Sequence, residues 1–313
     1  MKPSNIEDAV KLLKSGQVVA FPTETVYGLG AVAFDALAVA RIFEIKGRPH
    51  FDPLIVHVAN AKLAFDLCQS RPSAASRLAD AFWPGPLTLV LPKHPSIPDI
   101  VTAGLPSVAV RVPSHPVAQL LLAAVGVPLA APSANRFGRV SPTTAAHVYS
   151  DLGTDVPLIL DGGSCNTGIE STIVSLLRER PQLLRPGSVS LEDIQAIVGE
   201  VDSNTNSTER PQSPGQMRSH YAPRTRLEPL RGAAPPGNLE RVGLLSMGPT
   251  STSGYTAIEV LSEAGDLREA ACNLFAALRR LDERHLDRIV CEFAPPHGLG
   301  NAINDRLWRG CQR

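Results

Sequence analysis

The chain has 313 residues, of which 43% are hydrophobic and 19% charged, and 30 acidic residues balance 30 basic ones. This length predicts one large domain and a smaller one, and the composition is that of an ordinary soluble globular protein. Zero net charge argues against a protein whose main task is to hold nucleic acid by charge. The five cysteines include no C-x-x-C pair, which argues against a disulfide framework or a zinc ribbon. No signal peptide or membrane-spanning run is evident, so we expect a cytoplasmic protein.

Alternating helices and strands are predicted along the first 177 residues. Apolar residues at helical spacing predict a helix over 6–14 before a strand at 17–21. The following elements are a helix from Asp35 to Lys46, a strand at 53–58, helices at 62–68 and 74–82, strands at 87–91 and 107–112, a helix at 116–125, a strand at 128–132, a helix following "SPTTAAHV" (141–148), and strands at 157–162 and 171–177. Because some connections are short, we expect an α/β fold with a twisted mixed β-sheet and flanking helices.

A linker separates this part from a second one. Residues 199–216 are nearly free of large apolar side chains and rich in Ser, Asn, Thr and Pro, so they cannot form a core. A β-α-β-α pattern follows, with strands at 241–248 and 287–294 and helices at 266–282 and 298–308. This pattern is typical of a small Rossmann-like α/β domain. We expect an N-terminal domain at 1–200, a linker at 201–227 and a C-terminal domain at 228–313.

Two nucleotide-binding motifs are excluded. Residues 28–33 fit the dinucleotide fingerprint G-x-G-x-x-A, but six polar or turn residues separate them from the preceding strand, and the next helix starts at Asp35. The sequence contains no G-x-x-x-x-G-K-[ST]. A nicotinamide-binding protein and a P-loop NTPase are therefore not expected.

Two polar segments at the ends of predicted elements fit a polyphosphate. In "KGRP", Lys46 and Arg48 can converge on phosphate groups, although a solvated helix end explains them equally well. The loop at 131–143 offers Ser133, Ser141 and backbone N–H groups to phosphate oxygens, although it also fits an ordinary loop.

Further residues extend this pattern. His57 lies in an apolar strand, where a histidine is more often a satisfied core residue than a ligand. Arg111 is a charge in another apolar strand and needs an anionic partner. Ser171 and Arg185 come at strand ends. Together these segments indicate an anion-binding cleft in a neutral protein.

Six motifs in this order resemble a known family. They are "FPTETVYGLG" (21–30), "KGRP" (46–49) followed by "PLIVHV" (53–58), "AVRVP" (109–113), "PSANRFGRVSPT" (132–143), "GIESTIV" (168–174) and "LRPG" (184–187). They resemble the YrdC-type domain of threonylcarbamoyl-AMP synthases. The linker motif "SPGQMRSHYAP" (213–223) and the C-terminal part resemble the longer Sua5 form, so the resemblance covers nearly the whole chain.

The resemblance implies an enzyme, a nucleotidyltransferase that joins L-threonine, bicarbonate or CO₂, and ATP into L-threonylcarbamoyladenylate and diphosphate. This is the first step in forming N6-threonylcarbamoyladenosine at position 37 of tRNAs that read codons beginning with A. Mg²⁺ is expected with ATP, and no metal site of the protein's own. We expect a monomer linked in function to the tRNA threonylcarbamoyl transferase machinery, with only weak contact to tRNA and none to membranes.

The resemblance also implies the site residues. It places L-threonine against Thr25, His57, Arg111, Ala131 and Ser171, with Arg111 on the carboxylate. It places ATP against Arg48, Asp52, Ser107, Ser133, Asn135, Ser141, Arg185 and Tyr221, with Lys46 and Arg48 as catalytic residues. The linker is expected to cover the nucleotide through Tyr221.

Three points stay open in this assignment. Family members usually have Asn where this chain has Asp52, and an aspartate would repel phosphate unless Mg²⁺ or Arg48 intervenes. The proton acceptor is either His57 or a water. Glu24 either contacts the substrate amine or holds its loop, while Gly28 and Gly30 are expected to let the chain turn close to the substrate.

Two alternatives remain. The carbamoyl transferase of hydrogenase maturation carries a similar domain, but that family adds zinc-binding cysteine pairs that this chain lacks. An RNA-binding YrdC-like protein without adenylate synthesis is the other alternative. Lys46 and Arg48 occur here together with Ser133 and Asn135, which favours catalysis.

Overall fold

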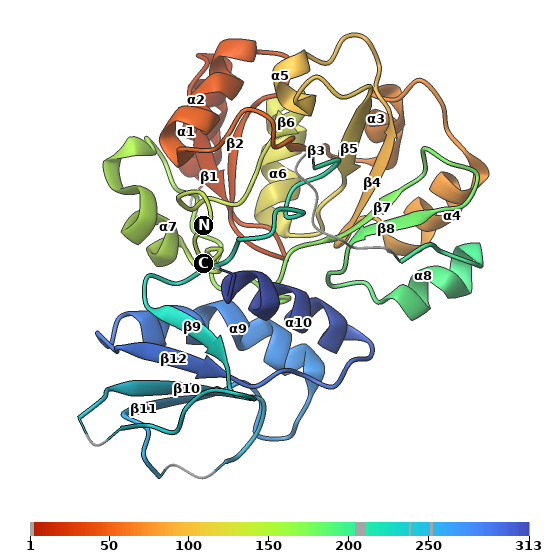
Figure 1. Ribbon diagram of the computed structural model, residues 1–313. Helices are drawn as coiled ribbons and strands as arrows, with labels where there is room; N and C mark the ends of the chain where they lie inside the picture. Colours follow the sequence, from red (N-terminus) through yellow and green to blue (C-terminus); the bar gives the residue numbers. More distant parts are fainter. Residues whose placement is uncertain (1–2, 204–210, 238, 251–252, 313) are drawn as a thin grey trace.

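Two sheets organise the chain (Figure 1). The structure is a computed structural model that describes residues 3–203, 211–237, 239–250 and 253–312. Residues 204–210 of the predicted linker lie outside the described residues. No helix in the described ranges is long and apolar enough to cross a membrane.

The N-terminal sheet has eight strands in the order β1-β2-β6-β3-β5-β4-β7-β8. The strands are β1 (Val19–Phe21), β2 (Gly28–Val32), β3 (Ile55–His57), β4 (Leu87–Pro92), β5 (Ser107–Arg111), β6 (Leu129–Ala130), β7 (Thr172–Ser175) and β8 (Gln182–Arg185). The β3·β5 and β4·β7 pairs are parallel, and the other pairs are antiparallel. The predicted mixed sheet is confirmed.

Helices flank this sheet, and a single 3₁₀ turn, Gly153–Asp155, follows α7. The helices are α1 (Pro3–Lys14), α2 (Ala36–Lys46), α3 (Ala61–Asp66), α4 (Ser73–Phe82), α5 (Asp99–Thr102), α6 (Pro116–Val125), α7 (Ala145–Leu152) and α8 (Leu191–Val198). Helix α2 shows why the local prediction succeeds. Its N-cap, Asp35, accepts hydrogen bonds from two backbone N–H groups at 3.0 Å, and Gly47 ends it with a left-handed φ of 61°.

Two expectations for this domain are wrong. The segment 157–162 forms no strand, because only Ile159 bridges to Ala20 of β1 and residues 160–163 have no regular structure. Gly28 and Gly30 lie in β2, not in a turn. A Cβ on Gly30 would lie 2.7 Å from the ring of Phe21, so this glycine is needed for packing between neighbouring strands.

The C-terminal sheet is entirely parallel, in the order β11-β10-β12-β9. Its elements are β9 (Arg226–Pro229), β10 (Val242–Ser246), β11 (Ala257–Val260), α9 (Leu267–Asp282), β12 (Arg288–Cys291) and α10 (Leu299–Gly310). The α/β prediction is confirmed, and β9 and β11 extend the predicted pattern. Figure 1 shows α9 and α10 between this sheet and the N-terminal domain.

The two domains share one hydrophobic cluster. Val26, Val140 and Ile169 of the N-terminal domain pack in the same cluster as Leu274 and Leu278 of α9. Close approach requires a glycine: at Gly168, where φ is 74°, a Cβ would lie 2.3 Å from a backbone oxygen of α9. The domain interface is therefore an extension of the C-terminal core.

Candidate functional site

A small cavity of about 50 Å³ lies where most of the sequence motifs meet. It is lined by Thr23, Thr25, Val26, Gly28, Arg48, Ile55, His57, Arg111, Ala131, Pro132, Ser133, Glu170, Ser171, Arg185, Pro214, Gly215, His220 and Tyr221. Two larger hollows between the domains, of about 1050 and 830 Å³, contain none of the residues predicted for the site. Volume therefore does not identify the site here, whereas the convergence of charged and polar groups does.

The sheet forms the floor of this cavity. In β3 and β5, alternate side chains share a face, so Ile55 lies beside His57 and Ala109 beside Arg111. The parallel register pairs Ile55 with Ala109 and His57 with Arg111. The two polar side chains are thus set side by side at the carboxyl ends of neighbouring parallel strands.

Arg111 is held by three groups. Its Nε donates to the Gly85 carbonyl oxygen at 3.3 Å, Nη1 donates to Thr25 Oγ1 at 3.0 Å, and Nη2 lies 2.8 Å from Glu24 Oε1. Burial alone would raise the pKa of Glu24, but the Arg111 guanidinium holds the pKa below its ordinary value. Glu24 also accepts a hydrogen bond from Ser114 N at 3.1 Å. Glu24 therefore orients Arg111 and ties its own loop to the chain after β5.

The hydroxyl of Thr25 has a defined direction. Thr23 Oγ1 donates to the Val26 carbonyl oxygen at 2.7 Å, and the two threonine hydroxyl oxygens lie 2.8 Å apart. Because Thr23 has already used its single hydrogen, Thr25 donates to Thr23 and accepts from Arg111. A ligand that contacts Thr25 would therefore meet an acceptor.

His57 lies on the cavity wall as a neutral imidazole. Burial, helped by the nearby positive charge of Arg111, lowers the pKa of His57 to about 3. Its Nδ1 is buried and has no hydrogen-bond partner among the described residues. This nitrogen is consequently available to a ligand.

Lys46 and Arg48 flank the left-handed Gly47 and are both buried. Lys46 Nζ donates to the carbonyl oxygens of Ser133 and Asn135 at 2.6 and 2.5 Å. Burial and the neighbouring Arg48 hold the pKa of Lys46 well below its ordinary value. The lysine thus lies beneath the loop after β6 and has no carboxylate partner among the described residues.

Arg48 forms an ion pair with Asp52. Its Nη2 lies 2.9 Å from Asp52 Oδ2, and the guanidinium also donates to the carbonyl oxygens of Asp52 and Pro53. Burial raises the pKa of Asp52, although Arg48 and Lys46 act against this rise. Arg48 is therefore placed to screen phosphate from the aspartate.

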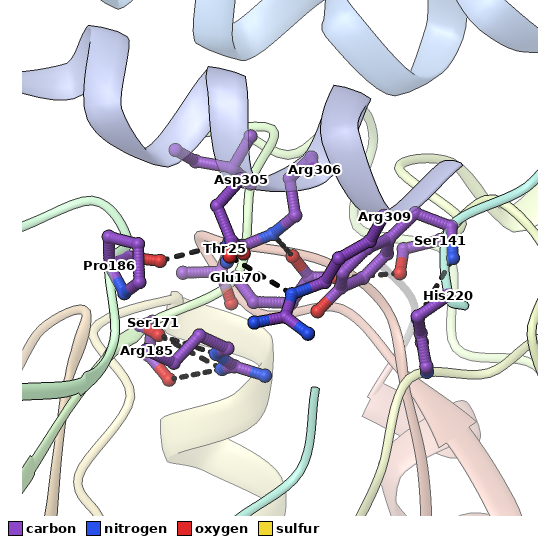
Figure 2. A network of polar contacts seen from close by, with 12 residues as sticks. Thr25, Ser141, Glu170, Ser171, Arg185, Pro186, His220, Asp305, Arg306 and Arg309 are labelled. Atoms are coloured by element: carbon purple, nitrogen blue, oxygen red, sulfur yellow. Dashed lines mark hydrogen bonds and ion pairs between the residues drawn. The ribbon is translucent and has the colours of Figure 1, made fainter. Parts of the chain in front are cut away.

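A second polar network closes the other side of the cavity (Figure 2). Arg185 donates to the Ser171 carbonyl oxygen and hydroxyl at 2.9 and 3.2 Å and, through Nη1, to the Pro214 carbonyl oxygen of the linker at 3.2 Å. Ser141 donates to Glu170 at 2.5 Å. Ser141 has no second hydrogen to donate, so a phosphate oxygen would compete with Glu170 for it.

The linker forms the roof of the cavity. Pro214, Gly215, His220 and Tyr221 all line it. A Cβ on Gly215, where φ is 83°, would lie 2.6 Å from the Tyr221 hydroxyl, so the two ends of this segment pack against each other. Tyr221 stacks on Phe275 of α9, with ring centroids 5.7 Å apart. The C-terminal domain thus supports the roof.

The structure brings together most of the residues predicted for the site. Those that line the cavity are Thr25, His57, Arg111, Ala131, Ser171, Arg48, Ser133, Arg185 and Tyr221. Four predicted residues do not line the cavity but contact residues connected to its wall. Lys46 donates to the carbonyl oxygens of Ser133, on the wall, and Asn135. Asp52 pairs with Arg48, and Ser141 donates to Glu170. Ser107 begins β5, at the end opposite Arg111, and does not line the cavity.

Two charged residues of the site were not predicted. Glu170 lies within "GIESTIV", directly before Ser171, and this position beside a predicted ligand was the available signal. Arg306 of α10 pairs with Glu170 at 2.8 Å. The helical pattern of the sequence does not show which arginine is buried, so the role of Arg306 could be recognised only in the structure.

Comparisons with known proteins agree with this geometry. A family model for the Sua5, YciO and YrdC proteins, described as "Telomere recombination", matches residues 11–187. A second, described as "Threonylcarbamoyl-AMP synthase, C-terminal domain", matches residues 189–311. The two models follow one another along nearly the whole chain.

Relatives from distant organisms match along the same length. A threonylcarbamoyl-AMP synthase of Pyrococcus abyssi is 41% identical over 314 residues, covering 96% of this chain and 92% of the relative. One of Bacillus subtilis is 41% identical over 322 residues, covering 97% and 92%. One of Vibrio vulnificus is 38% identical over 186 residues, which is 59% of this chain but 99% of the relative.

A solved structure shares the whole fold. P. abyssi Sua5 complexed with L-threonine superposes with a TM-score of 0.91 at 39% identity, covering 99% of this chain and 95% of that one. The resemblance seen in the sequence motifs is therefore confirmed. The chain belongs to the Sua5 family of threonylcarbamoyl-AMP synthases, the enzymes of the first step of N6-threonylcarbamoyladenosine formation.

Proposed function

We propose that the cavity beneath the linker is where this synthase joins L-threonine, bicarbonate and ATP into L-threonylcarbamoyladenylate and diphosphate. The carrying observation is that two buried arginines, Arg111 and Arg185, line one cavity, and that Lys46 donates to the carbonyl oxygen of Ser133 on the cavity wall. Threonine must first become a carbamate, whose oxygen then attacks the α-phosphorus of ATP. Holding these groups in line is worth roughly 7–11 kcal/mol.

L-Threonine is proposed to bind at the Arg111 end. A guanidinium has five N–H donors, and the three contacts of Arg111 leave one on each Nη nitrogen for a carboxylate. The Thr25 hydroxyl and the free His57 Nδ1 are proposed to contact the rest of the amino acid, with Ala131 and Ser171 closing the pocket. The solved relative with bound L-threonine supports L-threonine as a ligand of this chain.

ATP is proposed to bind between the loop after β6 and the linker. Lys46 and Arg48 act as the catalytic cations, and Arg185, Ser133, Asn135, Ser141 and Tyr221 hold the nucleotide. A cavity of about 50 Å³ is too small for ATP, because sites for small molecules are usually several hundred Å³. We therefore propose that Pro214–Tyr221 of the linker shift when ATP enters.

Mg²⁺ is proposed to arrive with ATP. Mg²⁺ bound to a nucleotide keeps several waters and its phosphate ligands and takes only one or two carboxylates from a protein. Asp52 Oδ1 is buried without a hydrogen-bond partner and is the carboxylate oxygen that fits such an ion. Bound there, Mg²⁺ would neutralise phosphate charge.

A water molecule is the proposed proton acceptor. With a pKa of about 3, His57 binds protons too weakly to act as a base near neutral pH. His57 is then a hydrogen-bonding partner of threonine. We further propose that the product is passed to the tRNA threonylcarbamoyl transferase machinery by a cytoplasmic, monomeric enzyme.

The test is diphosphate release from ATP. We expect release that requires ATP, L-threonine and bicarbonate together, and none when any one is omitted. Lys46→Ala should reduce release by about 100-fold or more, because it removes the donor that holds the Ser133 and Asn135 loop, against which the phosphates are proposed to lie. Lys62→Ala, which removes an exposed lysine paired with Asp66, is the control. RNA binding with no such release would favour the RNA-binding alternative.

A further inference from the structure

Helix α10 buries two arginines at the boundary between the domains. Arg306 and Arg309 are 1% and 2% exposed. Arg309 pairs with Asp305 at 2.9 Å and donates to the Met217 carbonyl oxygen of the linker at 2.5 Å. Arg306 reaches across to Glu170 of the N-terminal domain (Figure 2). An arginine is rarely buried to this extent unless its charge is matched.

Arg306 joins segments that border the cavity. Its Nε lies 2.8 Å from Glu170 Oε2, and Nη1 donates to the Pro186 carbonyl oxygen at 3.0 Å and to Asp305 at 2.7 Å. The guanidinium carbon lies 5.0 Å from the centre of the Tyr221 ring, a cation–π contact. One side chain of the C-terminal domain thus fixes both the wall and the roof of the site.

Glu170 is the group that makes this contact important. It lines the cavity, and its second oxygen accepts the hydrogen bond from Ser141. Burial alone would raise the pKa of Glu170, but Arg306, then Arg185 and the Ser141 hydroxyl, hold the pKa below its ordinary value. An ionised carboxylate therefore borders the space proposed for a triphosphate, and it would repel that ligand unless its charge were compensated.

Stability alone does not explain the buried ion pair of Arg306 and Glu170. Taking two charges out of water costs about as much as their attraction returns, whereas removing one partner leaves the other charge buried and unmatched. A buried carboxylate facing a site for anions is useful only if a cation accompanies it. Arg306 supplies that cation from outside the catalytic domain.

We propose that Arg306 is a positioning residue for adenylate formation, which compensates the charge of Glu170 and holds Tyr221 over the nucleoside triphosphate. The inference rests on the function and the ATP site proposed above. It assigns the C-terminal domain an electrostatic contribution to nucleotide binding. Arg306 acts through Glu170 and Tyr221 and is not assigned a contact with substrate.

Three variants of the full chain test this proposal. Arg306→Met keeps most of the side-chain volume but removes the cation that pairs directly with Glu170, and we expect the KM for ATP to rise at least about tenfold, with a smaller change in kcat. Glu170→Gln removes the carboxylate charge that Arg306 compensates, so adding Arg306→Met to this variant should change the KM for ATP much less than the same substitution changes it in wild type. The double variant, which combines Arg306→Met with Glu170→Gln, should recover most of the affinity for ATP that Arg306→Met loses. Diphosphate release at saturating L-threonine and bicarbonate measures all three.

The pH profile gives an independent readout. Without Arg306, burial raises the pKa of Glu170, so acidification neutralises the carboxylate. The KM for ATP of Arg306→Met, relative to wild type, should therefore fall as the pH is lowered from about 8 to about 6. The double variant, which has no carboxyl at this position, should show no such fall.

Arg280→Met is the matched control. It also removes an arginine of the C-terminal domain that pairs with a glutamate, Glu259, but on the exposed side of α9. Its KM for ATP should equal that of wild type. A double variant no better than Arg306→Met, together with a flat pH profile, would assign Arg306 a purely structural role and overturn the proposal.

Folding and function are checked separately. Unfolding midpoints are measured for each variant, and if Arg306→Met does not fold, the double variant must fold and bind ATP, because it holds no uncompensated charge. A double variant that also fails to fold overturns the proposal. If wild type shows no release requiring all three substrates, the proposed function fails; if wild type is active and Arg306→Met matches it, only the assignment of Arg306 fails.

Discussion

Each cation of the site has a different partner, and the partner decides what the cation can still bind. Arg111 and Arg48 are paired with Glu24 and Asp52, so part of their positive charge is already matched within the protein. Lys46 and Arg185 contact only carbonyl and hydroxyl oxygens within the described ranges. The uncompensated positive charge is therefore concentrated where we place the phosphates.

The sequence predicted the cations of the site better than its anions. Lys46, Arg48 and Arg111 stand at element ends or in apolar strands, where a charge is conspicuous. Glu24 and Glu170 carry no such mark, because their importance lies in which arginine they meet after folding. Pairings between residues about 90 and 140 positions apart cannot be obtained from local pattern.

His57 provides a prediction about acid stability. Its pKa is about 3 in the folded protein and about 6.5 in an unfolded chain, so in this interval the unfolded state binds one more proton. The free energy of unfolding should therefore decrease as the pH falls from about 6.5 towards 3, by about 1.4 kcal/mol per pH unit for this group. Urea unfolding between pH 7 and pH 4 should show a shallower decrease for His57→Gln than for wild type. The exposed His297→Gln should follow wild type; equal slopes for all three proteins would contradict the prediction.

At the scale of elements, capped helices were predictable and short sheet pairings were not. Asp35 and Gly47 delimit α2 by signals that act within a few residues. By contrast, β6 has two residues, and the expected strand at 157–162 is reduced to a single bridge, because pairing depends on how much of the neighbouring strand is available. Helix α2 matters for the site because its last residue is Lys46.

Gly47 provides a prediction at this scale. Its φ of 61° is strained for other residues, so Gly47→Ala should lower the free energy of unfolding by about 1 kcal/mol. The same change should raise the KM for ATP, because this turn directs Lys46 and Arg48. Gly126→Ala is the control: Gly126 ends α6 at a φ of 73°, and neither glycine has an atom within 4 Å of an added Cβ. Both variants should lose the same free energy of unfolding, but only Gly47→Ala should raise the KM for ATP. An equal rise in KM for Gly126→Ala would refute this prediction.

At the scale of the whole molecule, two domains were predictable from composition, but their coupling was not. The polar linker and the change of pattern after it are visible in the sequence. The packing of Val26, Val140 and Ile169 into the C-terminal core is not, because apolar residues in a motif look the same whether they face their own domain or another.

The shared cluster predicts cooperative unfolding. We expect a single calorimetric transition for the full chain, because neither domain can open without exposing the cluster of the other. Ile169→Asp places an unmatched charge in that cluster and should separate the transition into two. Leu177→Asp, at a residue that is 41% exposed, should leave one transition. Two transitions in wild type would show that the domains unfold independently.

The packing of Val26, Val140 and Ile169 also restricts how such an enzyme can be shortened. The Vibrio vulnificus relative corresponds to only 59% of this chain, while 99% of its own length is matched. In a protein without α9, the positions equivalent to these three would face water. In such a protein we expect hydrophilic residues at these positions, or a second copy of the chain that covers them. Gain or loss of the C-terminal domain in evolution therefore required changes on both sides of the domain interface.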